Sequence, residues 1–196
     1  MLAYCLFALT LVAGVFAGEP HLELEPAFTM RAGIEPGITT GPVHKGYTIT
    51  FVNSPNGTIV SAPDAKTTIN ATILGGDDLI HIDPQGGNFR LDVRGVAKYI
   101  PPPSLPPRNQ TSIFKFGYTG VAIPSEEMTK ALTRQPDSKT TEFGNIQTHH
   151  TFETPVAATD LAGLSNDQFM GMGRILVNPD RSVTVEYVVS RVVIVK

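Results

Sequence analysis

Short segments in which apolar and polar side chains alternate recur along the whole chain. In residues 47–51, for example, aromatic and aliphatic side chains take the odd positions and threonines the even ones. A period of two is typical of a β-strand with one buried face. The 18 glycines and 16 prolines fall between these segments, which favours turns between strands over a helical bundle. The pattern therefore restricts the chain to an all-β fold.

The alternating segments predict about nine or ten antiparallel strands in a single domain. They lie at 21–25 with a continuation to 30, and at 47–52, 58–62, 67–74, 79–82, 88–100, 113–123, 143–153, 169–177 and 182–195. Residues 33–41, 54–57 and 75–78 contain glycine or proline, and we expect loops or turns there. Closing so many strands into a barrel removes exposed sheet edges. We therefore predict an antiparallel β-barrel.

One or two short helices should accompany the strands. Ser125 has the chemistry of an N-cap, and Glu126 and Glu127 follow it in the first helical turn. This predicts a helix that ends near Arg134. Residues 160–167 predict a second helical turn.

The first 17 residues carry no charged side chain and are almost wholly apolar. Val15 and Ala17 occupy the −3 and −1 positions of a small-residue cleavage site. We predict a secretory signal peptide over 1–17 and one domain over 18–196; a membrane anchor is the alternative. No later apolar run is long enough to span a bilayer, so we expect no membrane association after cleavage.

Cysteine usage and sequons fit a secreted protein. Cys5 is the single cysteine and lies in the predicted signal, so the mature chain has no disulfide and no cysteine metal ligand. Asn56, Asn70 and Asn109 begin N-x-S/T sequons, which predict glycosylation at exposed positions. Asn70 falls on the polar side of its strand, so a glycan there would project outward.

Several classes of function find no support. The formal net charge is −3 and no lysine or arginine cluster occurs, so we expect no nucleic-acid partner. Spacings typical of metal sites, the G-x-S-x-G elbow of hydrolases and a complete dinucleotide loop are absent, so we expect no metal and no cofactor. The proline-rich run 101–107 favours a surface loop over an SH3-type ligand.

Three groups of residues resemble one family in their order and spacing. They are Ile73–Asp78 followed by Asp83–Arg94, then Phe152–Thr154, and last Asn166–Arg174. Over roughly residues 23–195 the chain resembles the DUF3237 (UPF0311-type) proteins. The resemblance implies a β-barrel, often dimeric, with no assigned general activity. Bacterial members usually carry tryptophan where this chain has Leu79 and Leu164, and the sequence has no tryptophan, so its pocket must be shaped differently.

Secreted fungal members of this family are similar to proteins of secondary-metabolite clusters. Some resemble hetero-Diels–Alderases that join a tropolone-derived o-quinone methide to a humulene-type terpene. The resemblance therefore implies a cofactor-free pericyclic enzyme with a small apolar or aromatic metabolite as its partner, and a possible homodimer. A lipocalin-like carrier without turnover is the alternative, and a barrel filled solidly by side chains would indicate a protein without a small ligand.

A cycloaddition of this kind needs a hydrogen-bond donor that polarises a carbonyl. Candidates for this catalytic role are Arg94, His150, Arg174 and Tyr118. Candidates for substrate binding are Asp78, Asp92, Phe114, Phe116, Phe152, Glu153, Met170 and Met172. The alternating Arg90, Asp92 and Arg94 are either interior donors or a solvated outer face with surface ion pairs, depending on which face points inward.

The segment 149–174 holds two further patterns. His149 and His150 are adjacent, so on a strand they face opposite ways, and His149 shares its face with Glu153. That pair is either an acid–base couple or a structural hydrogen bond. Gly171-Met172-Gly173 lacks the context of a dinucleotide loop and predicts a close approach to the backbone, or a bulge.

Overall fold

The structure is a computed structural model that describes residues 19–66, 68–101 and 112–196. The predicted signal peptide, the sequon at Asn109 and all but the first residue of the proline-rich run lie outside the described residues. The described strands are β1 (His21–Ile34), β2 (Ile38–Pro42), β3 (Thr48–Ser54), β4 (Asn56–Ser61), β5 (Asn70–Ile82), β6 (Phe89–Tyr99), β7 (Ile113–Ala122), β8 (Ile146–Glu153), β9 (Gln168–Val177) and β10 (Val183–Val195). The helices are α1 (Glu126–Leu132) and α2 (Ala162–Asn166), with single 3-10 turns η1 (Pro84–Gly86) and η2 (Thr159–Leu161).

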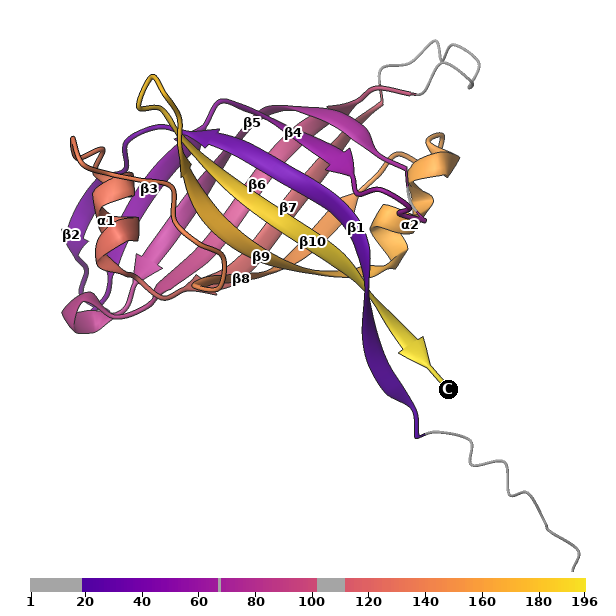
Figure 1. Cartoon of the computed structure of the whole chain (residues 1–196), viewed down its shortest axis with the longest axis horizontal. Coiled ribbons are helices and arrows are strands. Elements are labelled where there is room, and N and C mark those ends of the chain that lie inside the picture. The colour runs from indigo at the N-terminus through magenta and orange to yellow at the C-terminus, as the bar shows by residue number, and fades with distance from the viewer. Residues whose placement is uncertain (1–18, 67, 102–111) are drawn as a thin grey trace, which may run out of the picture.

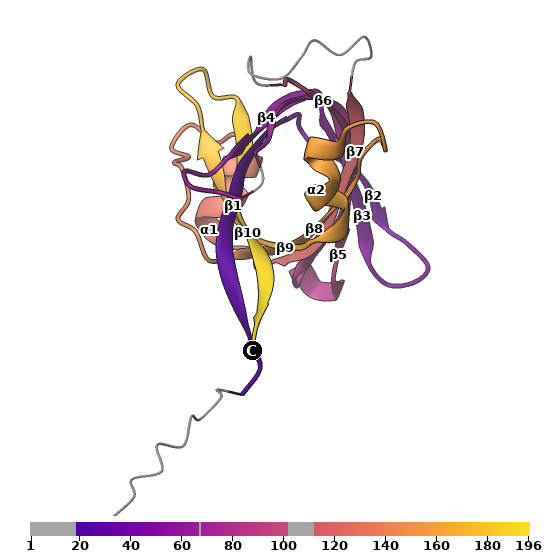
Figure 2. The ribbon, with the colours of Figure 1, turned by 90° about the vertical axis from the view of Figure 1, so that its right-hand side faces the viewer.

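The strands form one antiparallel sheet that closes on itself. Its order is β2-β3-β5-β4-β1-β10-β9-β8-β7-β6, and β6 also pairs with β5. Eight strands, β1 and β4–β10, therefore make a closed barrel, with β2 and β3 outside it (Figure 1). Figure 2 looks along this barrel, with α2 lying across the near end. The predicted antiparallel β-barrel with about nine or ten strands and one or two short helices is confirmed, with eight of the ten described strands in the closed barrel.

The two ends of the barrel differ because β5 changes its neighbour along its length. Its first half pairs with β4, and its second half pairs with β3. Near the end of β3, the Ser54 hydroxyl donates to the Gly33 carbonyl of β1 at 3.0 Å. Although β3 is not part of the closed circuit of paired strands, it therefore contacts both β5 and β1 at the end of the barrel nearer α1 (Figure 1).

The end nearer α2 is filled by aromatic side chains. Phe28, Phe114, Phe152 and Phe169 are buried there, and the rings of Phe28 and Phe152 meet edge-on with centroids 5.5 Å apart. Leu161 of η2 and Leu164 of α2 are fully buried and contribute to the same core. Aromatic pairs of this geometry add to the stabilisation from burial. This end is therefore a packed core, and space for a ligand inside the barrel lies at the other end.

Three segments predicted as loops or turns lie in strands. β2 occupies part of 33–41 because it pairs with β3 at the sheet edge. β4 begins at Asn56 and pairs with β1 and β5, so Asn56-Gly57 does not turn the chain back onto β3. A Cβ on Gly57 would lie 2.2 Å from the Arg31 carbonyl oxygen, so glycine is needed here for close packing rather than for a turn. Residues 75–78 continue β5.

The capping prediction for α1 is confirmed. The Ser125 hydroxyl accepts a hydrogen bond from the backbone N–H of Met128 at 3.2 Å. Met128 and Ala131 are buried, so this face of α1 packs against the barrel. In the part of the chain that the structure describes, neither helix is long and apolar enough to cross a bilayer.

Candidate functional site

A cavity of about 470 Å³ occupies the half of the barrel nearer α1. This volume lies within the roughly 300–1,000 Å³ typical of small-molecule sites. Its wall is mostly apolar and comes from several strands and from α1. The apolar lining includes Met30, Ile80, Ile82, Phe89, Leu91, Val93, Phe116, Met128, Ile146, Ile175 and Val185. The barrel is therefore not filled solidly by side chains.

A β-bulge in β5 turns Asp78 toward this cavity. Ile73 pairs with Ala97 of β6, but Gly75 pairs with the next residue, Val96, so Leu74 has no partner on β6. One extra residue reverses which side chains face inward beyond it. As a result Asp78 lies opposite the inward-facing Val93, and lines the cavity.

Asp78 is a carboxyl group in a mostly apolar environment. Burial raises its pKa to about 7, and the negative charges of Asp92 and Asp77 contribute in the same direction. The backbone N–H of Asp92 donates to Asp78 Oδ1 at 3.1 Å, which favours the charged form and partly opposes the shift. Near neutral pH Asp78 is therefore divided between its neutral acid, which can donate a hydrogen bond, and its carboxylate.

Tyr118 of β7 and Tyr187 of β10 bring two phenol groups to the same cavity. Their ring centroids are 4.9 Å apart. Burial raises the pKa of both hydroxyls above the ordinary value, and the charge of Asp78 raises them further. Both phenols remain protonated over the physiological pH range. A hydrogen bond from the Tyr118 hydroxyl to the Tyr187 hydroxyl raises the pKa of Tyr118 further and opposes the rise at Tyr187, so the pair leaves the Tyr187 O–H as a donor for a ligand.

His150 lies behind the two tyrosines. Its ring centroid is 4.8 Å from that of Tyr118, and its Nε2 is 2.8 Å from the Thr148 hydroxyl oxygen. Burial lowers its pKa to about 3, so the imidazole is neutral. A Cβ on Gly171 would lie 2.6 Å from both His150 Nε2 and Thr148 Oγ1. Gly171 therefore leaves room for this pair, as the prediction of a close approach required.

The structure places some of the predicted site residues on the inner face of the barrel and others on its outer face. Tyr118, Asp78 and Phe116 line the cavity, whereas His150, Phe114 and Phe152 are buried beside it in the packed core. Residues predicted for the same site but placed on the outer face of the barrel are Asp92, Arg94, Glu153, Met170, Met172 and Arg174. His149 and His150 face opposite ways, as predicted.

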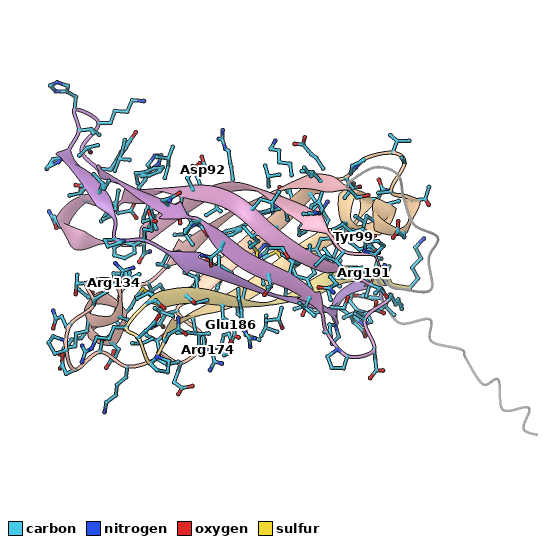
Figure 3. The ribbon with its side chains drawn as sticks, turned by 90° about the horizontal axis from the view of Figure 1, so that it is seen from above. Asp92, Tyr99, Arg134, Arg174, Glu186 and Arg191 are labelled. Atoms are coloured by element: carbon cyan, nitrogen blue, oxygen red, sulfur yellow. The ribbon has the colours of Figure 1, made fainter. Side chains whose placement is uncertain are left out.

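The outward residues of β6–β8 form ion pairs instead of an interior ladder. Arg94 Nη2 lies 3.3 Å from Asp92 Oδ2, and Lys115 Nζ lies 2.6 Å from Glu153 Oε1. Figure 3 shows Asp92 on the outer surface. The apolar residues between them, such as Val93, take the inward positions because burying them is favourable. The solvated outer face is therefore the correct one of the two alternatives, and Arg94 has no access to the barrel interior.

Arg174 also points outward, and its positive charge is paired with a carboxylate. Its Nη2 lies 2.7 Å from Oε1 of the buried Glu186, and its guanidinium lies 4.6 Å from the centroid of the Phe143 ring. Met170 and Met172 of the same strand expose 43% and 49% of their surface. These three residues cannot contact a ligand in the cavity.

Two residues that bring polar groups to the cavity, Tyr187 and Arg134, were not among the site residues predicted from the sequence. Tyr187 was missed because it lies within a run of β-branched residues that reads as core, although a single phenol in such a run is a usable signal. Arg134 was predicted only as the end of a helix, and it lines the cavity beside α1. In the described residues, no three histidine, aspartate or glutamate side chains gather as possible metal ligands.

The comparison with known families agrees with the resemblance. A family model described as a protein of unknown function, DUF3237, matches residues 22–192. The chain belongs to the DUF3237 family. No curated protein matches the chain. The family match covers most of this DUF3237 barrel, and the description of the family assigns no activity.

Solved structures share the fold of this DUF3237 barrel. A conserved protein of unknown function from Rhodopseudomonas palustris aligns with a TM-score of 0.65 and 17% identity, over 88% of this chain and 99% of that one. A protein of unknown function from Clostridium acetobutylicum aligns with a TM-score of 0.58 and 15% identity, over 87% and 99%. At such identities the likeness concerns the fold alone.

Proposed function

We propose that this protein is a cofactor-independent enzyme that binds a small, largely apolar carbonyl compound in the barrel and polarises its carbonyl oxygen. The observation that carries the proposal is the cluster of Asp78, Tyr118 and Tyr187 in a mostly apolar cavity. Protonated donors fixed in a site of low dielectric stabilise developing negative charge far better than donors in water. A buried neutral carboxylic acid beside a phenol can form such an oxyanion hole.

The reaction we propose is an intermolecular hetero-Diels–Alder cycloaddition between an o-quinone methide and a terpene. A C–C bond and a C–O bond form at the expense of two π bonds, while a third π bond moves. The step releases no proton, electron or leaving group, so it needs a cavity that holds both reactants and donors for the carbonyl oxygen. Holding reactants at attack distance can lower a barrier by roughly 7–11 kcal/mol.

The experiment mixes the purified protein with an o-quinone methide released in situ and a humulene-type alkene. The readouts are the initial rate and the enantiomeric ratio of the adduct, because the uncatalysed reaction gives a racemate. We expect one enantiomer in excess from the native protein, and a rate loss of at least about tenfold in the double variant Tyr118→Phe/Tyr187→Phe. Asp78→Asn should also be slower, since the amide is a weaker acid.

Arg94→Gln is the matched control, because Arg94 is a charged donor on the outer face of the same barrel wall. Its rate should equal that of the native protein. A racemic adduct formed at the background rate by the native protein would refute the catalytic proposal. Loss of rate in Arg94→Gln with none in the tyrosine variant would refute the assignment of the donors.

A carrier function is the second candidate, because most of the residues that line the cavity are apolar. A carrier would bind such compounds without turnover, and an aromatic truncation such as Phe116→Ala would weaken binding.

We further propose a secretory route for the chain. Asn56 and Asn70 are exposed and accessible to glycans. Deglycosylation followed by mass spectrometry tests the glycans, and size-exclusion chromatography tests the predicted homodimer.

A further inference from the structure

Arg134 is the one positively charged residue among the described residues that line the cavity. It follows α1 and has a left-handed backbone conformation, with φ of 54°. Its Nη2 donates to the Ile34 carbonyl oxygen of β1 at 2.8 Å. This bond joins the end of α1 to the barrel wall and holds the guanidinium at the α1 end of the molecule (Figure 3).

The guanidinium of Arg134 keeps donors free, unlike most arginines of the chain. Five of the seven described arginines pair with carboxylates: Arg31, Arg90, Arg94, Arg174 and Arg191. Within the described residues, no carboxylate lies at ion-pairing distance from Arg134, and its side chain makes the single bond to Ile34. Since a guanidinium carries five N–H donors, most remain available to a ligand.

The polar groups of the cavity lie at two depths. Ile82, Phe89 and Ala122 form the row of paired residues nearest α1 on β5, β6 and β7. Asp78, Val93 and Tyr118 form a row four residues further along β5, which is roughly 13 Å along an extended strand. Apolar side chains such as Ile80 separate the two depths. A ligand that forms hydrogen bonds with the polar groups at both depths must therefore carry polar groups at two positions on an apolar body.

We propose that Arg134 binds the anionic group of an amphipathic ligand whose apolar body fills the cavity. The ligand class is an organic anion such as a carboxylate or an acidic enol. A guanidinium recognises such groups with two parallel hydrogen bonds, which fixes orientation as well as affinity. This inference deepens the proposed function, because it rests on the cavity being a ligand site and adds the charge and orientation of the ligand.

Three acidic residues, Asp77, Asp78 and Glu35, also line the cavity. The one to weigh against this site is Glu35, because it directly follows Ile34, whose carbonyl accepts the Arg134 bond. Its Oε2 accepts a hydrogen bond from Asn53 Nδ2 at 2.8 Å, so the carboxylate is directed toward β3. Glu35 should nevertheless repel an anion at the entrance. Removing its charge should therefore strengthen anion binding, opposite in sign to the effect of removing Arg134.

Two fluorescent probes test the proposal. 1-Anilinonaphthalene-8-sulfonate is anionic, and N-phenyl-1-naphthylamine is its neutral counterpart without the sulfonate. We expect Arg134→Gln to weaken binding of the anionic probe about tenfold and to leave the neutral probe unchanged, since one charge-assisted contact is lost. Glu35→Gln should strengthen binding of the anionic probe alone.

Arg181→Gln is the matched control. Arg181 also has a positive φ, and its guanidinium donates to backbone carbonyls of Gln135 and Pro136, but it does not line the cavity. It should change neither affinity. A cavity-filling Ile80→Trp variant should weaken both probes, which shows that they bind inside the barrel. Circular dichroism confirms that each variant is folded.

The outcomes separate this inference from the proposed function. If the native protein binds neither probe, or if Ile80→Trp leaves both unchanged, the cavity is not a ligand site and both proposals fail. If both probes bind in the cavity and Arg134→Gln weakens both equally or neither, the anion site is refuted while the cavity function stands. Selective loss of the anionic probe supports the site.

Discussion

Gly173 on β9 lies directly against the ring of Tyr187 on β10, its partner in the strand register. A Cβ on Gly173 would stand 2.7 Å from Cε1 of that ring, closer than real side chains approach each other. The same relationship recurs between Gly95 and Phe116, which are partners on β6 and β7. Inward glycines therefore give inward aromatic rings the space to lie across a neighbouring strand.

The first prediction concerns Gly173→Ala. The added methyl group must displace the Tyr187 ring, so we expect a loss of about 1–3 kcal/mol in the free energy of unfolding. Urea denaturation measures this loss. Gly75→Ala is the matched control, because no atom lies within 4 Å of a Cβ at that strand position, and it should change stability by less than about 0.5 kcal/mol. Equal effects of the two variants would show that the ring is free to move.

The regular strands show what could be predicted from the sequence. The shared face of Phe114, Phe116 and Tyr118 and the opposite faces of His149 and His150 follow from uninterrupted alternation with a period of two residues. The Ser125 cap is a local interaction between residues three apart, so it too can be predicted from the sequence. These features depend on near neighbours only.

The features that were not predicted correctly depend on pairing between distant strands. Nothing in Ile73-Leu74-Gly75-Gly76 says which residue lacks a partner on β6, so the glycines predict a loop or turn at 75–78, where β5 in fact continues past a bulge at Leu74. Alternation groups Arg94 with Asp92 but does not say which face of the strand is inside. Tyr187 enters the site only because β10 lies across the barrel from Asp78 and beside Gly173.

The second prediction concerns the pH dependence of stability through Asp78. Its pKa is raised in the folded state to about 7 from an ordinary value of 3.8. The folded protein therefore binds more protons than the unfolded chain between these values, and its stability falls as pH rises through this window. The variant Asp78→Asn has no carboxyl group to ionise, and its amide oxygen can still accept the Asp92 N–H bond.

Asp78→Asn should therefore gain stability relative to the native protein as the pH rises from 5 to 8, by a few kcal/mol. Urea denaturation at both pH values measures the difference. Asp83→Asn is the control, because the pKa of Asp83 is lowered by its hydrogen bond with Arg90 on the surface, and the difference should not grow in this range. A constant difference for Asp78→Asn would mean that the carboxyl group is solvated.

The third prediction is that His150 does not titrate near neutral pH. Burial lowers its pKa from the ordinary 6.5 to about 3, so the unfolded chain takes up a proton as the pH falls below 6.5 while the folded protein does not. This group lowers stability toward acid pH, opposite in sign to Asp78. In NMR spectra the His150 ring resonances should stay constant between pH 5 and 8. A titration midpoint above 5 would contradict the buried neutral imidazole.

The last prediction concerns a row of charges on the outer face of the barrel. Glu186 of β10 lies between its partners Arg31 on β1 and Arg174 on β9, and Figure 3 shows it beside Arg174. Its side chain is only 4% exposed, and both arginines donate to it. Burial alone would raise the pKa of Glu186, but the hydrogen bonds from the two arginines outweigh it and hold the pKa below 4.5.

Because the pKa is lowered on folding, the stabilisation from Glu186 is complete above pH 4.5 and disappears as the pH falls through the folded-state value. Glu186→Gln should therefore cost about 2 kcal/mol at pH 7, since two charge-assisted bonds are weakened in a buried setting, and much less near pH 3. Glu153→Gln removes an exposed ion pair with Lys115 and should change stability little at either pH. If the two variants lost equally little stability at pH 7, the row Arg31–Glu186–Arg174 would contribute no more to the free energy of unfolding than a surface ion pair. The contacts between β1, β10 and β9 would then be stabilised by backbone pairing and the interior core alone.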